Sequence, residues 1–148
     1  MSNELDFIFY NNEMYSRYEL AMKMKSEGNI DEVERLLLPS VIPPSIYHGH
    51  YRELFINWRK KIYLHEKAAE YSKIVSLIKL MIKLDAELLH KMREYWSPIH
   101  GVDRSPEYFF RYSKIKKTDL KKLQKYSEII GDMDGKFLAE SLLNNHDC

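Results

Sequence analysis

Hydrophobic residues recur at three- to four-residue intervals along most of the chain, which is the spacing of one buried face of an α-helix. Residues 11–27 predict a first helix, and Gly28 suits the left-handed position that ends a helix. Asn29 and Glu32 resemble a capping box at the start of a short second helix. A third helix is expected over 47–62, with four inward side chains: Leu54, Phe55, Trp58 and Ile62.

The longest predicted helix covers residues 64–96, and its middle is apolar on most sides. From Ile74 to Leu84, eight of eleven residues are large and hydrophobic. A helix with so narrow a polar stripe has to be covered on most sides. We therefore expect a central helix that the other helices surround, or one that a second copy of the chain helps to cover.

The C-terminal third predicts three further helices. Pro106 suits the first position of a helix that runs to about Lys116. Thr118 or Asp119 is expected to cap the next helix, and Gly131 to end it. The inward residues expected there are Leu120, Leu123, Tyr126, Ile129 and Ile130. A last helix over 135–143 is expected to bury Phe137, Leu138 and Leu142.

No segment shows the alternation of a β-strand, and the 148 residues include only five glycines and five prolines. The sequence therefore predicts an all-α, single-domain bundle of about six to seven helices over residues 1–148 around the central helix 64–96. A chain of this length is typical of one domain. It is also long enough to form a hydrophobic core without a metal or a disulfide.

Charge is balanced overall but uneven along the chain. Lys and Arg number 23 against 22 Asp and Glu, a net charge of +1, which disfavours a dedicated nucleic-acid binder. Residues 1–34 contain eight acids and three bases, residues 111–125 seven bases and one acid, and residues 128–148 five acids and one base. Such a surface can steer a charged partner.

The basic segment 111–125 leaves three interpretations open. Lysines contact phosphates whatever the base sequence, so the segment is a candidate nucleic-acid site. It also suits a solvated helix face or an acidic protein partner. The basic side chains of this alternative site are Arg111, Lys114, Lys116, Lys117, Lys121, Lys122 and Lys125.

The sequence AMKMKSEGNIDEV over residues 21–33 reads as two helices joined by a Gly-Asn turn, with Ala21 and Val33 where the helices are expected to cross. This unit resembles a tetratricopeptide repeat, although Arg17 stands where that family has a large aromatic residue. The resemblance extends over about residues 10–96 as repeat-like helical hairpins, with residues 105–148 as C-terminal capping helices.

The resemblance implies a groove that binds peptides or proteins, because that family performs no chemistry. The first helix of each repeat lines the groove in that family. The partner-binding side chains that it implies here are Tyr15, Tyr18, Met22, Lys25, Arg52, Ile56, Arg59 and Lys60.

No known catalytic signature is found in the sequence. It has neither a phosphate-binding Gly–Lys–Ser/Thr loop, nor a Gly-x-Ser-x-Gly elbow, nor a paired-histidine zinc helix. His48 and His50 are a metal candidate, because histidines two apart converge from an extended segment but diverge on a helix. We expect no catalytic residue, no cofactor and no bound metal, with a metal-dependent enzyme at His48 and His50 as an alternative.

The expected function is that of a non-enzymatic protein-binding module with a charged, tyrosine-rich face. The chain has eleven tyrosines, and tyrosine is a favoured anchor in protein interfaces. An inhibitor or immunity-type protein and an adaptor both fit, and a nucleic-acid-binding regulator that uses residues 111–125 is an alternative. The single Cys148, the acidic N-terminal residues and the lack of a long apolar run predict a cytoplasmic protein without membrane contact. A homo-oligomer stays open.

Overall fold

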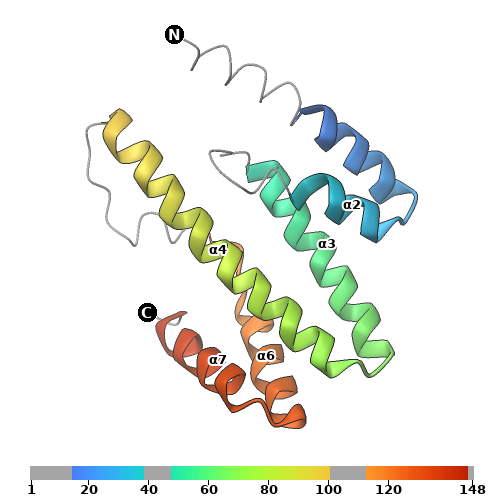
Figure 1. Ribbon diagram of the computed structural model, residues 1–148, viewed down its shortest axis with the longest axis vertical. Helices are drawn as coiled ribbons and strands as arrows, with labels where there is room; N and C mark the ends of the chain where they lie inside the picture. Colours follow the sequence, from blue (N-terminus) through green and yellow to red (C-terminus); the bar gives the residue numbers. More distant parts are fainter. Residues whose placement is uncertain (1–14, 39–47, 101–112, 147–148) are drawn as a thin grey trace. The chain divides into compact units, whose positions relative to one another are not determined.

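Helices form most of the chain that the structure describes. The computed structural model describes residues 15–38, 48–100 and 113–146. Within these ranges it contains six helices and no strand, which confirms the all-α prediction (Figure 1). The chain divides between Trp58 and Arg59 into two compact units, which we call unit 1 and unit 2.

Unit 1 contains the helix of residues 15–26, α2 (Ile30–Leu37) and the first part of α3 (His48–Lys67). Its buried apolar side chains come from all three helices. They are Ala21, Val33, Leu36, Leu37, Leu54, Phe55 and Trp58. The predicted inward face of α3 is thus confirmed, including Ile62 further along the helix.

Short-range contacts explain where the first two helices end and begin. Gly28 has a φ of +74°, a left-handed conformation that glycine adopts without strain, and it ends the first helix as predicted. Asn29 accepts a hydrogen bond from the backbone N–H of Glu32 through Oδ1 at 3.3 Å, which confirms its capping role. The Glu32 carboxylate, expected to complete a capping box, instead accepts hydrogen bonds from Arg35.

The turn after α3 lies later than predicted. α3 continues to Lys67, and α4 (Tyr71–His100) begins seven residues after the expected Leu64. The reason is that residues 62–67 contain neither glycine nor proline, so nothing in them stops a helix. The chain turns instead at Ala69, whose φ of +55° is uncommon for a residue other than glycine.

The apolar middle of α4 is covered, as its pattern predicted. Ile74, Ile78 and Met81 are fully buried, whereas Leu80 is partly exposed. The helix also continues through Pro98, where a loop was expected. That proline lies in the last turn, so its missing N–H removes only one hydrogen bond close to the helix end.

Unit 2 contains the end of α3, α4, α6 (Lys117–Ile130) and α7 (Met133–His146). α6 packs against both α4 and α7 (Figure 1). Its inward face carries Leu120, Leu123 and Tyr126, as predicted. Gly131, with a φ of +79°, ends α6 as expected, and the side chain of Asp132 accepts a hydrogen bond from the N–H of Gly135 at 3.0 Å.

Two expectations about the start of α6 are wrong. Residues 113–116 are not helical, so the helix expected over 106–116 does not reach that far, and residues 105–112 lie outside the described part of the chain. α6 begins at Lys117, and Asp119 occupies its third position. There its carboxylate accepts a hydrogen bond from the N–H of Lys116 at 2.8 Å, instead of serving as the N-cap.

Three hydrophobic residues that were expected inside are exposed: Ile129, Ile130 and Phe137. With 3.6 residues per turn, Ile129 lies about 120° around α6 from buried Leu123, and Phe137 lies about 160° around α7 from buried Ala139. α7 is also longer than expected, and the residues buried on its inward face are the small Gly135 and Ala139.

Gly135 lets α7 approach α6 closely. A Cβ at this position would lie 2.4 Å from Ser127 Oγ, which is buried and has no hydrogen-bond partner among the described residues.

We expect Gly135→Ala to lower the free energy of unfolding by about 1–3 kcal/mol through overpacking. In a Ser127→Ala background, which removes the clashing oxygen, the same substitution should cost much less, as a double-mutant cycle by urea unfolding will measure. Equal costs in both backgrounds would contradict this packing.

Candidate interaction surface

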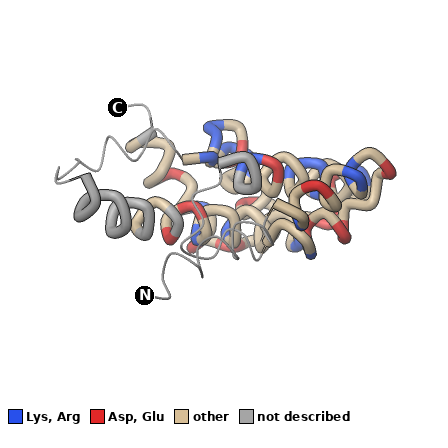
Figure 2. The backbone as a smooth tube through the Cα atoms, turned by 90° about the horizontal axis from the view of Figure 1, so that it is seen from above, with Lys and Arg blue, Asp and Glu red and all other residues tan. Residues whose placement is uncertain are grey.

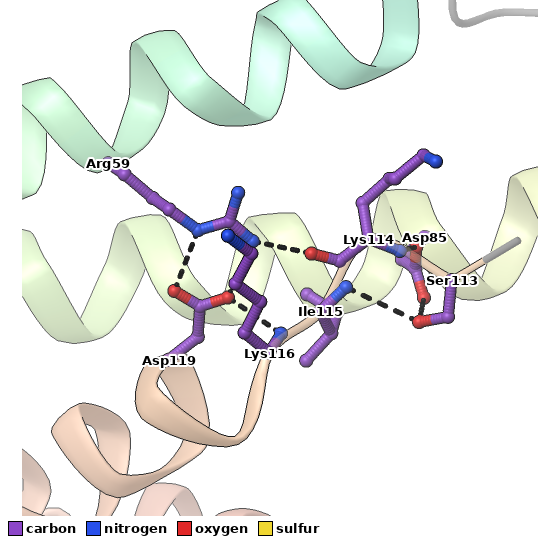
Figure 3. Close-up of polar contacts among 7 residues, drawn as sticks. All are labelled: Arg59, Asp85, Ser113, Lys114, Ile115, Lys116 and Asp119. Carbon is purple, nitrogen blue, oxygen red and sulfur yellow. Dashed lines mark hydrogen bonds and ion pairs between the residues drawn. The ribbon is translucent and has the colours of Figure 1, made fainter. Parts of the chain in front are cut away.

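A buried carboxylate holds the segment that leads into α6. Asp119 is only 3% exposed, and its two oxygens accept hydrogen bonds from Arg59 of α3, Nε at 3.1 Å and Nη2 at 2.8 Å (Figure 3). The guanidinium also donates to the carbonyl oxygen of Lys114. This two-point contact holds the start of α6 against α3 within unit 2. It thereby limits the directions in which the faces of α6 can point.

A second buried carboxylate ties the same segment to α4. Asp85 accepts hydrogen bonds from the hydroxyl of Ser113 at 2.6 Å and from the N–H of Lys114 at 2.8 Å (Figure 3). Ser113 Oγ in turn accepts from the N–H of Ile115 at 3.3 Å. These contacts satisfy polar groups that the fold buries, which is a structural role.

Glu66 near the end of α3 joins that helix to the middle of α6. Its carboxylate accepts hydrogen bonds from Lys122 Nζ at 2.8 Å and from the hydroxyl of Tyr126, whose ring stacks on Tyr71 with centroids 5.0 Å apart. Burial raises the pKa of Glu66, but the hydrogen bonds from Lys122 and Tyr126 outweigh it and hold that pKa below its usual value. Burial and the Glu66 carboxylate raise the pKa of Tyr126 to about 12.

With one face of α6 turned inward, its opposite face carries lysines. Lys117, Lys121 and Lys125 follow one another at four-residue intervals and are exposed, and we call them the basic row. Basic and acidic residues are interspersed along the described helices as a whole (Figure 2). The basic row therefore differs from its surroundings because its three charges, spread over about two turns of α6, have the same sign.

A group of exposed hydrophobic side chains lies where α6 ends and α7 begins. We call this group the apolar tip: Ile129 (54% exposed), Ile130 (38%), Met133 (52%) and Phe137 (60%). Two exposed acids, Glu128 and Asp134, lie beside these residues in the sequence. Four such large side chains within residues 129–137 are more than the scattered exposure that is normal for a protein surface.

The end of α3 has a smaller group of the same kind. Tyr63 and Leu64 are exposed, and Lys60 and Lys67 lie on the same side of the helix. The Lys67 ammonium lies 4.6 Å from the centre of the Tyr63 ring, within the range of a cation–π contact.

The groove residues implied by the repeat resemblance are divided between the units. Lys60 is exposed in unit 2, where Arg59 is engaged by Asp119. In unit 1, Lys25 forms an ion pair of 2.7 Å with buried Glu53. The remaining residues of the set are exposed or half-buried in unit 1: Tyr15, Tyr18, Met22, Arg52 and Ile56. The repeat resemblance and its groove stay predictions.

The basic segment divides into internal and external residues. Lys114 is half-buried with its backbone held by Asp85 and Arg59, and Lys122 pairs with Glu66. The exposed lysines are Lys116, Lys117, Lys121 and Lys125. Arg111 lies outside the described residues.

His48 and His50 occupy the first turn of α3, and their side chains lie outside the described part of the structure. Among the side chains that are described, no three His, Cys, Asp or Glu residues gather in a group that could hold a metal ion. No helix in the described ranges is long and apolar enough to cross a membrane.

Sequence reasoning missed the apolar tip, because Ile129, Ile130 and Phe137 fit a helical core spacing. A usable signal was present in the small residues of α7. Gly135 and Ala139 are four apart, and small residues at that interval mark the face on which two helices approach closely. Phe137 lies between them in sequence and therefore on the far side of the helix.

Comparisons of this chain with protein-family models, with curated proteins and with solved structures find no match.

Removing the buried carboxylate should destabilise the protein strongly. We expect Asp119→Ala to lower the free energy of unfolding by about 3 kcal/mol, because it leaves the Arg59 charge unpaired and the N–H of Lys116 without its acceptor. The control is Glu32→Ala, which breaks an exposed ion pair with Arg35 and should have a much smaller effect. Urea unfolding followed by circular dichroism measures both, and similar losses in the two variants would contradict a stabilising role for Asp119.

Tyr126 should make the protein sensitive to alkali. Its pKa is raised in the folded state to about 12 from its ordinary value of 10.0, so the folded state favours the protonated hydroxyl. This contribution to stability is fully present below pH 10 and is lost as the pH rises towards 12. We expect the unfolding free energy to fall less steeply over this range in Tyr126→Phe than in the parent protein. Tyr63→Phe, which removes an exposed hydroxyl, is the control, and identical pH profiles for all three proteins would contradict the prediction.

Proposed function

We propose that this protein is a protein-binding module that acts by docking to another protein and catalyses no reaction itself. The observation that carries the proposal is the apolar tip of unit 2. Several large hydrophobic side chains exposed within a short stretch of chain mark a candidate interaction site. Phe and Met are enriched in protein interfaces, and the tip contains both next to two isoleucines.

The use of the buried and half-buried carboxylates supports the same proposal. Asp85, Asp119 and Glu66 are each engaged by hydrogen bonds from other elements of unit 2. These carboxylates therefore hold helices in place, and we assign recognition to exposed side chains.

Two versions of such a module fit the surface. One is an inhibitor or immunity-type protein that covers the working surface of its target, and the other is an adaptor that holds a partner in place. In both versions, charges of one sign on a helix attract an oppositely charged partner and speed its association with the module. With a single cysteine in the sequence, the module suits a reducing compartment, and we place it in the cytoplasm.

A second candidate function is binding to nucleic acid. It is favoured by the exposed lysines at the start of α6, which offer phosphate contacts without sequence preference. Replacing Lys116, Lys117, Lys121 and Lys122 by Ala should then abolish both the binding and its dependence on salt. A parent protein that does not bind nucleic acid at low salt would exclude this candidate.

Site-specific photo-crosslinking in the native cell tests protein binding. A photoreactive amino acid replaces Phe137 in the apolar tip, and in the control it replaces Ser26, which is exposed in unit 1. We expect crosslinked proteins at position 137 that are absent at position 26 and that disappear when excess unlabelled protein is added. The same adducts at both positions, or nuclease-sensitive adducts alone, would overturn the proposal.

A further inference from the structure

The exposed side of the last two turns of α3 combines two positive charges with two large side chains that are mostly apolar. We call it the α3 face, and its residues are Lys60, Tyr63, Leu64 and Lys67. Their spacing of three, one and three residues places all four within about 100° of the circumference of one helix, on the side away from buried Ile62. Tyr63 is 56% exposed and Leu64 is 50% exposed.

The two lysines of the α3 face do not pair with any carboxylate of the described residues. Lys79 and Lys122 of the same unit show the contrast, because each forms an ion pair with an acid on another helix or turn. The Lys67 ammonium lies 4.6 Å from the centre of the Tyr63 ring, a contact made within the face itself. An ammonium has three N–H donors, so Lys67 keeps donors for a carboxylate while it covers the ring.

The side chains between the two lysines distinguish among occupants. A single-stranded nucleic acid stacks its bases on aromatic rings, but Lys67 covers one side of the Tyr63 ring, and Leu64 offers no ring to a base. A helix that lies on a membrane surface needs a long apolar stripe, whereas the α3 face has one Tyr and one Leu. A polypeptide with acidic and apolar side chains matches both the charges and the apolar centre.

The geometry of α3 favours a helical occupant over an extended one. The backbone N–H and C=O groups of a helix bond to one another, so α3 offers no edge to which an extended peptide could add a strand. A second helix satisfies its own backbone and needs only side chains from α3. Lys60 and Lys67 are about 10 Å apart along the helix axis, so carboxylates two turns apart on that second helix match them.

We propose that the α3 face binds an acidic amphipathic helix of a partner protein. Two carboxylates of that helix, about seven residues apart, pair with Lys60 and Lys67, and the apolar side chains between them pack on Tyr63 and Leu64. Contact with the apolar centre contributes affinity, while the two ion pairs set the register and speed the association. The proposal goes beyond the proposed function, since it names a second docking surface, separate from the apolar tip, and the chemistry of its occupant.

Two synthetic helical peptides test the α3 face on the full chain. The first has a Glu at each end of a two-turn stretch and two Leu between them on the same side, and the second has the same composition with both Glu moved to the opposite side. Fluorescence anisotropy should show about tenfold tighter binding of the first peptide, and added salt should reduce this difference. Equal binding of the two peptides to the parent protein, or no binding of either, would overturn the proposal.

Reversal of the charges locates the binding on α3. Lys60→Glu/Lys67→Glu should weaken binding of the first peptide about tenfold, and a third peptide with Lys in place of both Glu should bind this variant more tightly than it binds the parent. The control Lys83→Glu/Lys121→Glu makes the same change of charge on α4 and α6 and should bind like the parent. All four lysines are exposed, and circular dichroism checks that both variants fold. Equal weakening in the control, or no preference of the third peptide for the α3 variant, contradicts the proposal.

Photo-crosslinking in the native cell identifies the occupant. A photoreactive amino acid replaces Leu64 in the full chain, and mass spectrometry sequences the segment that it captures. We expect a segment of another protein with two acids about seven residues apart and apolar residues between them, and its loss in Lys60→Glu/Lys67→Glu. Adducts with a second copy of this chain, with nucleic acid, or with segments that lack the two acids overturn the proposal. Crosslinks at position 137 are scored separately, so a failed α3 face and a failed proposed function give different results.

Discussion

The ion pair between Arg59 and Asp119 is the interaction on which the arrangement of unit 2 depends. A carboxylate that is almost fully buried is stable only when its charge is neutralised and its oxygens accept hydrogen bonds. Here the guanidinium occupies both oxygens, and the N–H of Lys116 adds a third donor. A contact made at two points leaves α6 little freedom to rotate. The ion pair thus acts together with the buried apolar face of α6, which includes Leu123, to keep Lys121 on the outside.

Packing of α7 adds the second constraint. Because Gly135 has no side chain, α7 lies close to Ser127 of α6, and the small Ala139 continues the same face. Large side chains on the far face of α7 then have nothing in the described part of unit 2 to cover them, which leaves Met133 and Phe137 in solvent. The basic row and the apolar tip are therefore products of the packing inside, and the buried charges themselves remain structural.

The sequence predicted features that depend on nearest neighbours. Gly28 and Gly131 end helices because their backbone conformation is strained for most other residues, and Asn29 caps α2 through an N–H three residues away. The inward set of α3 was also predictable, since Leu54, Phe55, Trp58 and Ile62 share one face at helical spacing. The turn at Ala69 was not, because an alanine gives no local signal for a left-handed conformation.

By itself, then, the sequence determined that the described chain is helical, where several helices end, and which face of α3 is inside. Caps and spacing act within a few residues, so no distant contact is needed to read them. Only the tertiary structure decided that Arg59 belongs to a buried ion pair and that Ile129 and Phe137 are exposed. Both outcomes depend on which other helix lies against the residue, and Arg59 meets a carboxylate 60 residues away. A hydrophobic side chain near a helix end looks the same in sequence whether or not another helix covers it.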